Sequence, residues 1–169
     1  KFLGDWAAPE QRREWGDSPE ALFFNNCVYA MNLETFVEIA KILNKPHDVV
    51  IFGDRLKAIK PRIHDHFFDK EKKIYSIGCQ VQLAFPLLTG ITPDELRPSV
   101  IASFNREITE THPYLDMGSS GLPVLLKYLI EQSDNSEVLF RHLSKTTEPG
   151  YGYFISRGET TWPEYWNVD

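Results

Sequence analysis

Two kinds of apolar pattern alternate along this chain, and their alternation restricts how the chain can fold. One kind is apolar on nearly every side, which is typical of a helix that packs against several neighbours. The other places apolar residues at steps of three and four, which is typical of a surface helix with one buried face. The first kind covers residues 18–43, 79–88 and 122–130, and the second covers residues 49–63, 92–108 and 136–144. The sequence therefore predicts three helix pairs, each with an inner member followed by an outer one.

Helix pairs of this kind pack well when the inner helices form a ring, the outer helices cover it, and loops at one end build a cleft. We therefore expect an all-α fold, an (α/α) barrel with about three helix pairs and short irregular or β-like loop segments. Three pairs make half of a six-pair ring, and an open half would leave apolar inner helices facing water. We expect residues 1–169 to be a partial barrel, with its N-terminal half and its C-terminal remainder outside this chain.

Several helix boundaries can be predicted from local signals. Ser18-Pro19-Glu20 combines a capping hydroxyl, a proline at the first helical position and an acid in the first turn, and Thr92-Pro93-Asp94-Glu95 repeats this pattern. Pro61 lacks a backbone donor and should kink or end its helix. The expected non-helical parts are a long shaped loop over residues 1–17, an exposed turn with a short strand over residues 67–76, and a loop and strand region over residues 146–169.

The charge balance disfavours polyanionic partners. The chain has 18 basic and 24 acidic side chains, a formal net charge of −6, and its basic residues are scattered. This charge repels phosphate backbones and acidic membrane surfaces, so we expect neither nucleic acid nor membrane as a partner. Cys27 and Cys79 have no metal-ligand spacing, and His64 and His66, two apart on a helix, diverge by about 200°. We therefore expect no metal site.

The last part of the sequence gathers aromatic residues around an acid, Glu164. The aromatic residues are Tyr151, Tyr153, Trp162, Tyr165 and Trp166. Aromatic walls with a few polar groups suit a sugar, whose ring has an apolar face and a rim of hydroxyls. The alternative is that the rings fill a core and that Glu164 is a solvated loop acid. Composition alone leaves both interpretations open.

The same tail carries a spaced motif. Its members are Thr146, Thr147, Pro149, Gly152, Tyr153, Gly158, Thr160, Thr161, Glu164 and Trp166. This spacing resembles T-T-x-P-x-x-G-Y-x-x-x-x-G-A-T-T-x-W-E-x-W, a late loop that carries the catalytic base in bacterial α-L-rhamnosidases, which are six-hairpin glycosidases. Glu159 stands where that family often has Ala, and Trp162-Pro163 replaces a Trp placed directly before the Glu.

Three earlier segments agree with this resemblance, in chain order. Gly4-Asp5-Trp6 resembles the G-D-W that opens an active-site loop of the family. Residues 78–84 and 93–96 are similar to its S-Q-T-A-L-A-L-x-x-G-L-x-P-E-E-L. Residues 115–126 are similar to its L-T-T-G-x-x-G-x-P-x-L-L, the entry to a late inner helix. The resemblance spans essentially the whole chain.

The resemblance implies an enzyme that hydrolyses terminal α-L-rhamnosides of oligosaccharides, polysaccharides or glycosides with inversion. It implies that Glu164 is the general base and that the partner is a rhamnose-containing carbohydrate. The expected substrate contacts are Asp5 for sugar hydroxyls, Trp6 and Trp166 as stacking faces, and Trp162 and His112 at the cleft. Such acid–base chemistry needs no cofactor, and none is implied.

An inverting mechanism also needs a general acid about 6.5 to 9.5 Å from the base. In the family the acid lies upstream of G-D-W, so we expect it in the remaining part of the catalytic domain, without which the chain should be inactive. Residues 12–17 superficially resemble the acid motif R-E-R-x-G-W-x-G-D, but they follow G-D-W. We interpret them as a loop and do not assign Glu14 as the acid.

Two other functions remain open on the sequence. One is a carbohydrate-binding or structural α/α module that keeps the aromatic cleft but does no chemistry. The other is a six-hairpin glycosidase that acts on another sugar. A carboxylic acid that faces Glu164 at inverting distance would separate the enzyme from the non-catalytic module.

Overall fold

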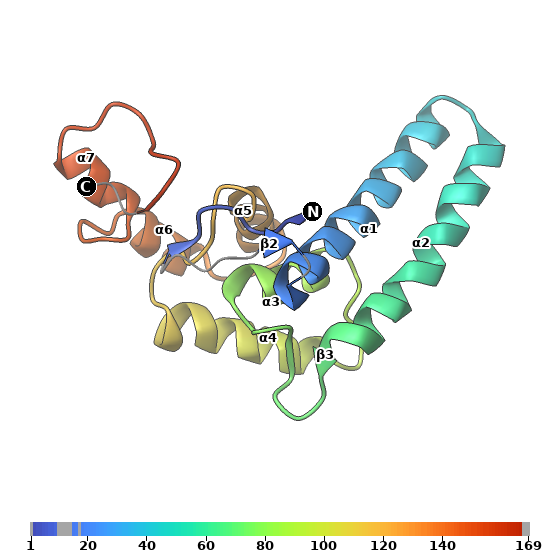
Figure 1. The fold of residues 1–169 in the computed structure, drawn as a ribbon, viewed down its shortest axis with the longest axis horizontal. Helices are drawn as coiled ribbons and strands as arrows, with labels where there is room; N and C mark the ends of the chain where they lie inside the picture. The colour runs from blue at the N-terminus through green and yellow to red at the C-terminus, as the bar shows by residue number, and fades with distance from the viewer. Residues whose placement is uncertain (1, 10–14, 17, 167–169) are drawn as a thin grey trace.

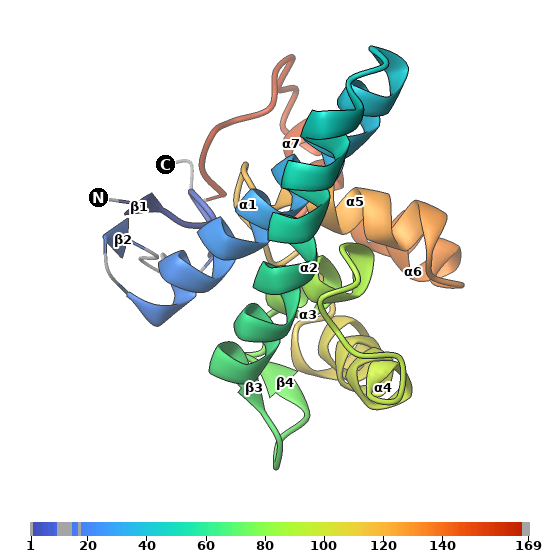
Figure 2. The ribbon, with the colours of Figure 1, turned by 90° about the vertical axis from the view of Figure 1, so that its right-hand side faces the viewer.

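The computed structural model describes residues 2–9, 15–16 and 18–166. Three helix hairpins follow one another, as the sequence predicts. They are α1 (Pro19–Ile42) with α2 (Pro46–Phe67), α3 (Gln80–Leu88) with α4 (Arg97–Arg106), and α5 (Leu122–Glu131) with α6 (Ser136–Leu143). Helix α3 contacts both α1 and α5, whereas α2 and α4 lie outside their partners (Figure 1; Figure 2). The prediction of inner and outer helices is confirmed.

Helix α3 is the centre of the core. All its residues from Gln80 to Leu87 are buried, which confirms the all-round apolar pattern. Phe85 meets Phe24 of α1 edge-on, with ring centroids 5.5 Å apart. This ring contact joins the inner helices α1 and α3 in the core. None of the helices in the described part of the chain has both the length and the apolar character that a membrane span requires.

Two short antiparallel ladders close the loops. Strands β1 (Phe2–Leu3) and β2 (Trp15–Gly16) pair with Phe2 opposite Gly16, so the expected loop over residues 1–17 begins and ends in a strand. Strands β3 (Phe68–Asp69) and β4 (Ile74–Tyr75) form the turn expected after α2. Glu14 lies outside the described residues.

Helix α1 begins where the sequence predicts. The backbone N–H of Ala21 donates to Ser18 Oγ at 3.1 Å, which caps the helix. The prediction that α1 is buried throughout is wrong for its second half, where the side chain of Ile42 is 82% exposed. The reason is that α1 and α2 extend together beyond the other helices (Figure 1), so only α2 covers this half, for example where Phe36 stacks on Phe52.

Neither proline signal marks a helix boundary: α2 runs through Pro61, and α4 begins after Pro93. Pro61 does not end α2, which continues to Phe67. Pro61 and Lys57, whose carbonyl loses its helical donor, are both exposed, so water can reach that carbonyl. Helix α4 begins at Arg97 rather than near Thr92, because the N–H groups of Ile91 and Thr92 donate to the carbonyl of Pro86 and tie this segment to the end of α3.

The prediction that residues 146–169 contain no helix is wrong. Helix α7 covers Tyr151–Ser156, and its N-terminal glycines allow it to dock on the end of α6. A Cβ at Gly150 would lie 2.5 Å from the carbonyl oxygen of Lys145, and one at Gly152 would lie 2.6 Å from that of Ser144. The backbone N–H of Tyr153 donates to the Lys145 carbonyl at 2.9 Å. These glycines therefore serve close packing.

The contact between the second and third hairpins gives a prediction about stability. Phe104 of α4 is fully buried and meets Tyr128 of α5 edge-on at 4.8 Å, whereas Phe140 of α6 is 73% exposed. Phe104→Ala should lower the free energy of unfolding by about 3–5 kcal/mol because it leaves a cavity. Phe140→Ala, the matched control, should change it by less than about 0.5 kcal/mol. Denaturant titration measures both, and equal effects would contradict this packing.

Candidate functional site

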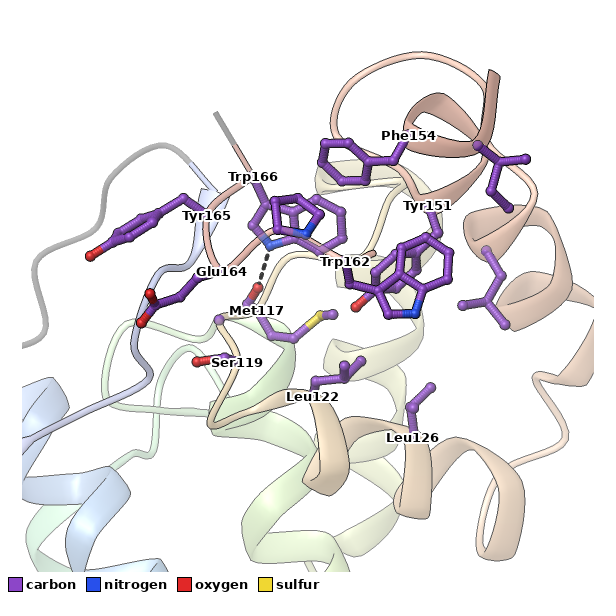
Figure 3. Close-up of a pocket in the computed structure, with 14 residues that line it drawn as sticks. Met117, Ser119, Leu122, Leu126, Tyr151, Phe154, Trp162, Glu164, Tyr165 and Trp166 are labelled. Carbon is purple, nitrogen blue, oxygen red and sulfur yellow. Dashed lines mark hydrogen bonds between the residues drawn. The ribbon is translucent and has the colours of Figure 1, made fainter. Parts of the chain in front are cut away.

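An apolar pocket of about 490 Å³ lies between α5, α7 and the segment 162–166. Its walls are mainly aromatic and aliphatic, and Glu164 and Ser119 supply polar groups at one edge (Figure 3). In Figure 3 the Glu164 carboxylate points away from the rings of Trp162 and Tyr151. The pocket thus combines an apolar wall with an acid at its rim, which is the composition expected for a sugar site.

Glu164 is exposed, and its carboxylate is held by a residue from the opposite end of the chain. The indole Nε1–H of Trp6 donates to Glu164 Oε1 at 2.7 Å. The Trp6 ring also packs against Tyr165, with ring centroids 5.9 Å apart. The structure therefore brings together Glu164 and Trp6, two of the site residues that the sequence singles out.

Asp5 fixes this N-terminal loop to the start of α5. Its side chain is 3% exposed, its Oδ2 accepts from the N–H of Gly118 at 2.8 Å, and its Oδ1 accepts from the N–H of Gly121 at 2.6 Å. The N–H groups at the start of a helix lack helical acceptors, and a carboxylate is favourable there. Asp5 was expected to hold sugar hydroxyls, but its oxygens bind the protein backbone. These bonds give Asp5 a structural part, and a sugar contact by Asp5 stays a prediction.

Gly118 and Gly121 are required by the close approach of this loop. A Cβ on Gly118 would lie 1.7 Å from the carbonyl oxygen of Trp6, and a Cβ on Gly121 would lie 2.6 Å from Asp5 Oδ2. The Trp6 carbonyl also accepts from the N–H of Ser119 at 2.7 Å. The loop over residues 118–121 is therefore the part of the chain on which Asp5 and Trp6 dock.

The two tryptophans of the tail have different environments. Trp166 is buried, and its Nε1–H donates to the carbonyl of Met117 at 2.7 Å (Figure 3). Trp162 is 59% exposed and meets Tyr151 edge-on at 4.6 Å. Because its ring is exposed, Trp162 offers more ring surface to a ligand than Trp166 does. The neighbouring Tyr151 hydroxyl stays neutral, because burial raises its pKa above the usual value.

His112 lies in a separate cluster and is not part of the pocket wall. Its Nδ1 is 2.6 Å from Glu107 Oε1 and 3.9 Å from Asp116 Oδ2. One donor atom from each of these three side chains lies within 4.8 Å of the others, so the set has the donors for a metal ion. A sugar contact by His112 stays a prediction.

The sequence analysis missed the residues that shape the His112 loop. Glu107 reaches His112 because α4 continues into η2, a π-helical turn over Glu107–Thr111, and sequence spacing gives no signal for such a turn. Gln80 Nε2–H donates to the carbonyls of His112 and Tyr114, at 2.9 and 2.7 Å. The signal that could have indicated Gln80 is a polar residue at the start of an all-apolar helix, where burial demands a partner.

Comparison with known proteins identifies one family over the whole chain. The family model of the bacterial alpha-L-rhamnosidase 6 hairpin glycosidase domain matches residues 1–169. A curated alpha-L-rhamnosidase from Formosa agariphila is 22% identical over 167 residues, which cover 98% of this chain and 18% of that protein.

Solved structures of the same kind superpose closely. An alpha-L-rhamnosidase from Dictyoglumus thermophilum has a TM-score of 0.86 at 25% identity, over 99% of this chain and 19% of that chain. The alpha-L-rhamnosidase from Streptomyces avermitilis, complexed with L-rhamnose, has a TM-score of 0.83 at 24% identity. The match covers 97% of this chain and 15% of that chain. The prediction of an (α/α) barrel of the six-hairpin type is confirmed. The chain spans less than about a fifth of the length of these relatives.

The docking of Asp5 and Trp6 on the glycine loop gives a prediction. Gly118→Ala places a methyl group on the Trp6 backbone, so it should lower the free energy of unfolding by about 1–3 kcal/mol or more. Gly53→Ala is the matched control: Gly53 lies inside α2 with open space around its Cα, and the change should raise stability by about 0.5–1 kcal/mol. Denaturant titration of both variants checks the opposite signs, and a stable Gly118→Ala protein would contradict this contact.

Proposed function

This chain belongs to the bacterial α-L-rhamnosidase six-hairpin glycosidase family, and we propose that it supplies the base-bearing part of the catalytic domain of an inverting α-L-rhamnosidase. Residues 1–169 are then one section of the barrel, and the remaining part of the domain carries the general acid. The observation that carries this proposal is Glu164, which is in register with the catalytic-base motif and stands at the rim of an aromatic pocket.

Glu164 is suited to act on water. Its side chain is exposed, so water can reach the carboxylate, and Trp6 binds Oε1. We assign Oε2 to the attacking water. The base takes a proton as the water oxygen bonds to the anomeric carbon, while the acid on the other face protonates the leaving glycosidic oxygen. The glycosidic C–O bond breaks, and the sugar leaves with its anomeric configuration inverted.

The pocket wall suits the proposed substrate. Rhamnose is a deoxy sugar whose methyl group replaces a hydroxymethyl group, so it tolerates apolar surroundings better than an ordinary hexose does. Beside Glu164 the wall includes Met117, Leu122, Tyr151 and Trp162. Trp162, with its exposed ring, is our candidate for a stacking contact, because sugars bind aromatic faces through their C–H groups. A non-catalytic carbohydrate-binding module would use the same wall but not the carboxylate.

The proposal predicts that Glu164 is essential in the complete enzyme. Glu164→Gln keeps the size of the side chain and removes the base, so kcat for an aryl α-L-rhamnoside should fall by about 10²–10⁴-fold. Glu159→Gln is the matched control, because Glu159 is an exposed acid in the same loop, and it should keep near-normal activity. Release of the aryl group measures both rates. Near-full activity of Glu164→Gln would exclude Glu164 as the base.

The stereochemistry of the product gives an independent prediction. Attack by water opposite the leaving group should release β-L-rhamnose first, which then mutarotates to the mixture of anomers. Proton NMR spectra recorded within the first minutes of hydrolysis distinguish the two anomeric protons. If α-L-rhamnose were released first, a retaining mechanism would apply and Glu164 would need a different role.

A further inference from the structure

We propose that Trp6 is a positioning residue for Glu164: its indole N–H holds the carboxylate in the orientation from which the second oxygen takes a proton from water. This inference rests on the proposed role of Glu164 as the base. The family resemblance gives Trp6 a different part, as a stacking face for the sugar. The two parts use different features of the indole, because stacking uses its face and positioning uses the N–H on its edge.

The bond between the two side chains has the geometry of a strong hydrogen bond. The indole nitrogen can only donate, and its distance of 2.7 Å to Glu164 Oε1 is in the range of charge-assisted bonds. Glu164 stands on a segment without helix or strand, and its side chain is exposed. An exposed glutamate samples several rotamers, and fixing one of them costs conformational entropy. The Trp6 bond selects one orientation before the substrate binds, which is what a general base requires.

The donor is itself anchored to a rigid element. Asp5, its chain neighbour, accepts from the backbone N–H groups of Gly118 and Gly121 at the start of α5. The carbonyl of Trp6 accepts from the N–H of Ser119 at 2.7 Å. These bonds place the indole relative to an inner helix. The orientation of Glu164 therefore depends on α5, through a connection that joins positions 158 residues apart in the sequence.

The test replaces the N–H without changing the shape of the ring. In the complete enzyme, benzothienylalanine at position 6 keeps a bicyclic aromatic ring and has sulfur in place of the N–H. We expect kcat for an aryl α-L-rhamnoside to fall by about 10–100-fold, the loss that corresponds to a hydrogen bond with a charged group. KM should stay within about two-fold. Trp6→Phe, which also lacks the donor, should show the same loss of kcat.

The matched control places the same analogue at Phe140, an exposed aromatic residue on α6, and should leave kcat unchanged. Unchanged kcat with benzothienylalanine at position 6 would overturn the positioning role. A raised KM with normal kcat in Trp6→Phe would instead assign Trp6 to stacking.

A double-mutant cycle separates this inference from the proposed function. If Trp6 acts through Glu164, Trp6→Phe should cost less than about two-fold in a Glu164→Gln background, because the group it positions is already lost. Equal losses in both backgrounds would show that Trp6 acts independently and would overturn the inference. Full activity of Glu164→Gln alone would overturn the proposed function. An inactive Glu164→Gln enzyme together with a fully active analogue enzyme would leave the function standing and reject only the role of Trp6.

Discussion

One buried carboxylate determines how the candidate site is assembled. Asp5 accepts hydrogen bonds from the N–H of Gly121, the N-cap of α5, which a helix leaves without an acceptor of its own, and from the N–H of Gly118 in the loop before it. Leaving a buried donor unsatisfied costs about 1–3 kcal/mol, so the N-terminal loop and α5 are strongly held together. Trp6 follows Asp5 directly, and its indole reaches Glu164. The orientation of Glu164 is thus linked, through Trp6, to the hydrogen bonds between Asp5 and the backbone before α5.

The helices form the scaffold, and the loops carry the candidate site residues. Inner helices α1, α3 and α5 supply a packed scaffold, and α3 is buried on all sides. The candidate site residues lie on segments that connect or follow these helices, as is common where a rigid scaffold positions functional loops. Trp166 connects the two levels, because its ring packs on Phe154 of α7 and its indole N–H binds the Met117 carbonyl before α5. The tail is therefore attached to the scaffold two residues after Glu164.

Patterns along the chain predicted what depends on local chemistry. The all-round apolar segments predicted the inner helices, and Ser18 predicted the start of α1 to the residue. Patterns failed where a distant contact decides. Residues 146–169 were predicted to lack a helix, but Gly150 and Gly152 let α7 pack on the end of α6. A proline signal failed for a local reason, since Pro61 lies in exposed surroundings and does not end α2. Spacing also gives no signal for the hydrogen bond that Asp5 accepts from the N–H of Gly121, more than a hundred residues away.

The most direct test of the account is a crystal structure of the complete enzyme with an unreactive thio-rhamnoside bound. The account predicts an ordered water about 2.6–3.2 Å from the Glu164 carboxylate, on the face of the anomeric carbon opposite the sulfur. It also predicts a carboxylic acid from another part of the domain beside the sulfur, about 6.5 to 9.5 Å from Glu164. A sugar bound away from Glu164, or a Glu164 side chain turned into bulk solvent with the substrate in place, would contradict it.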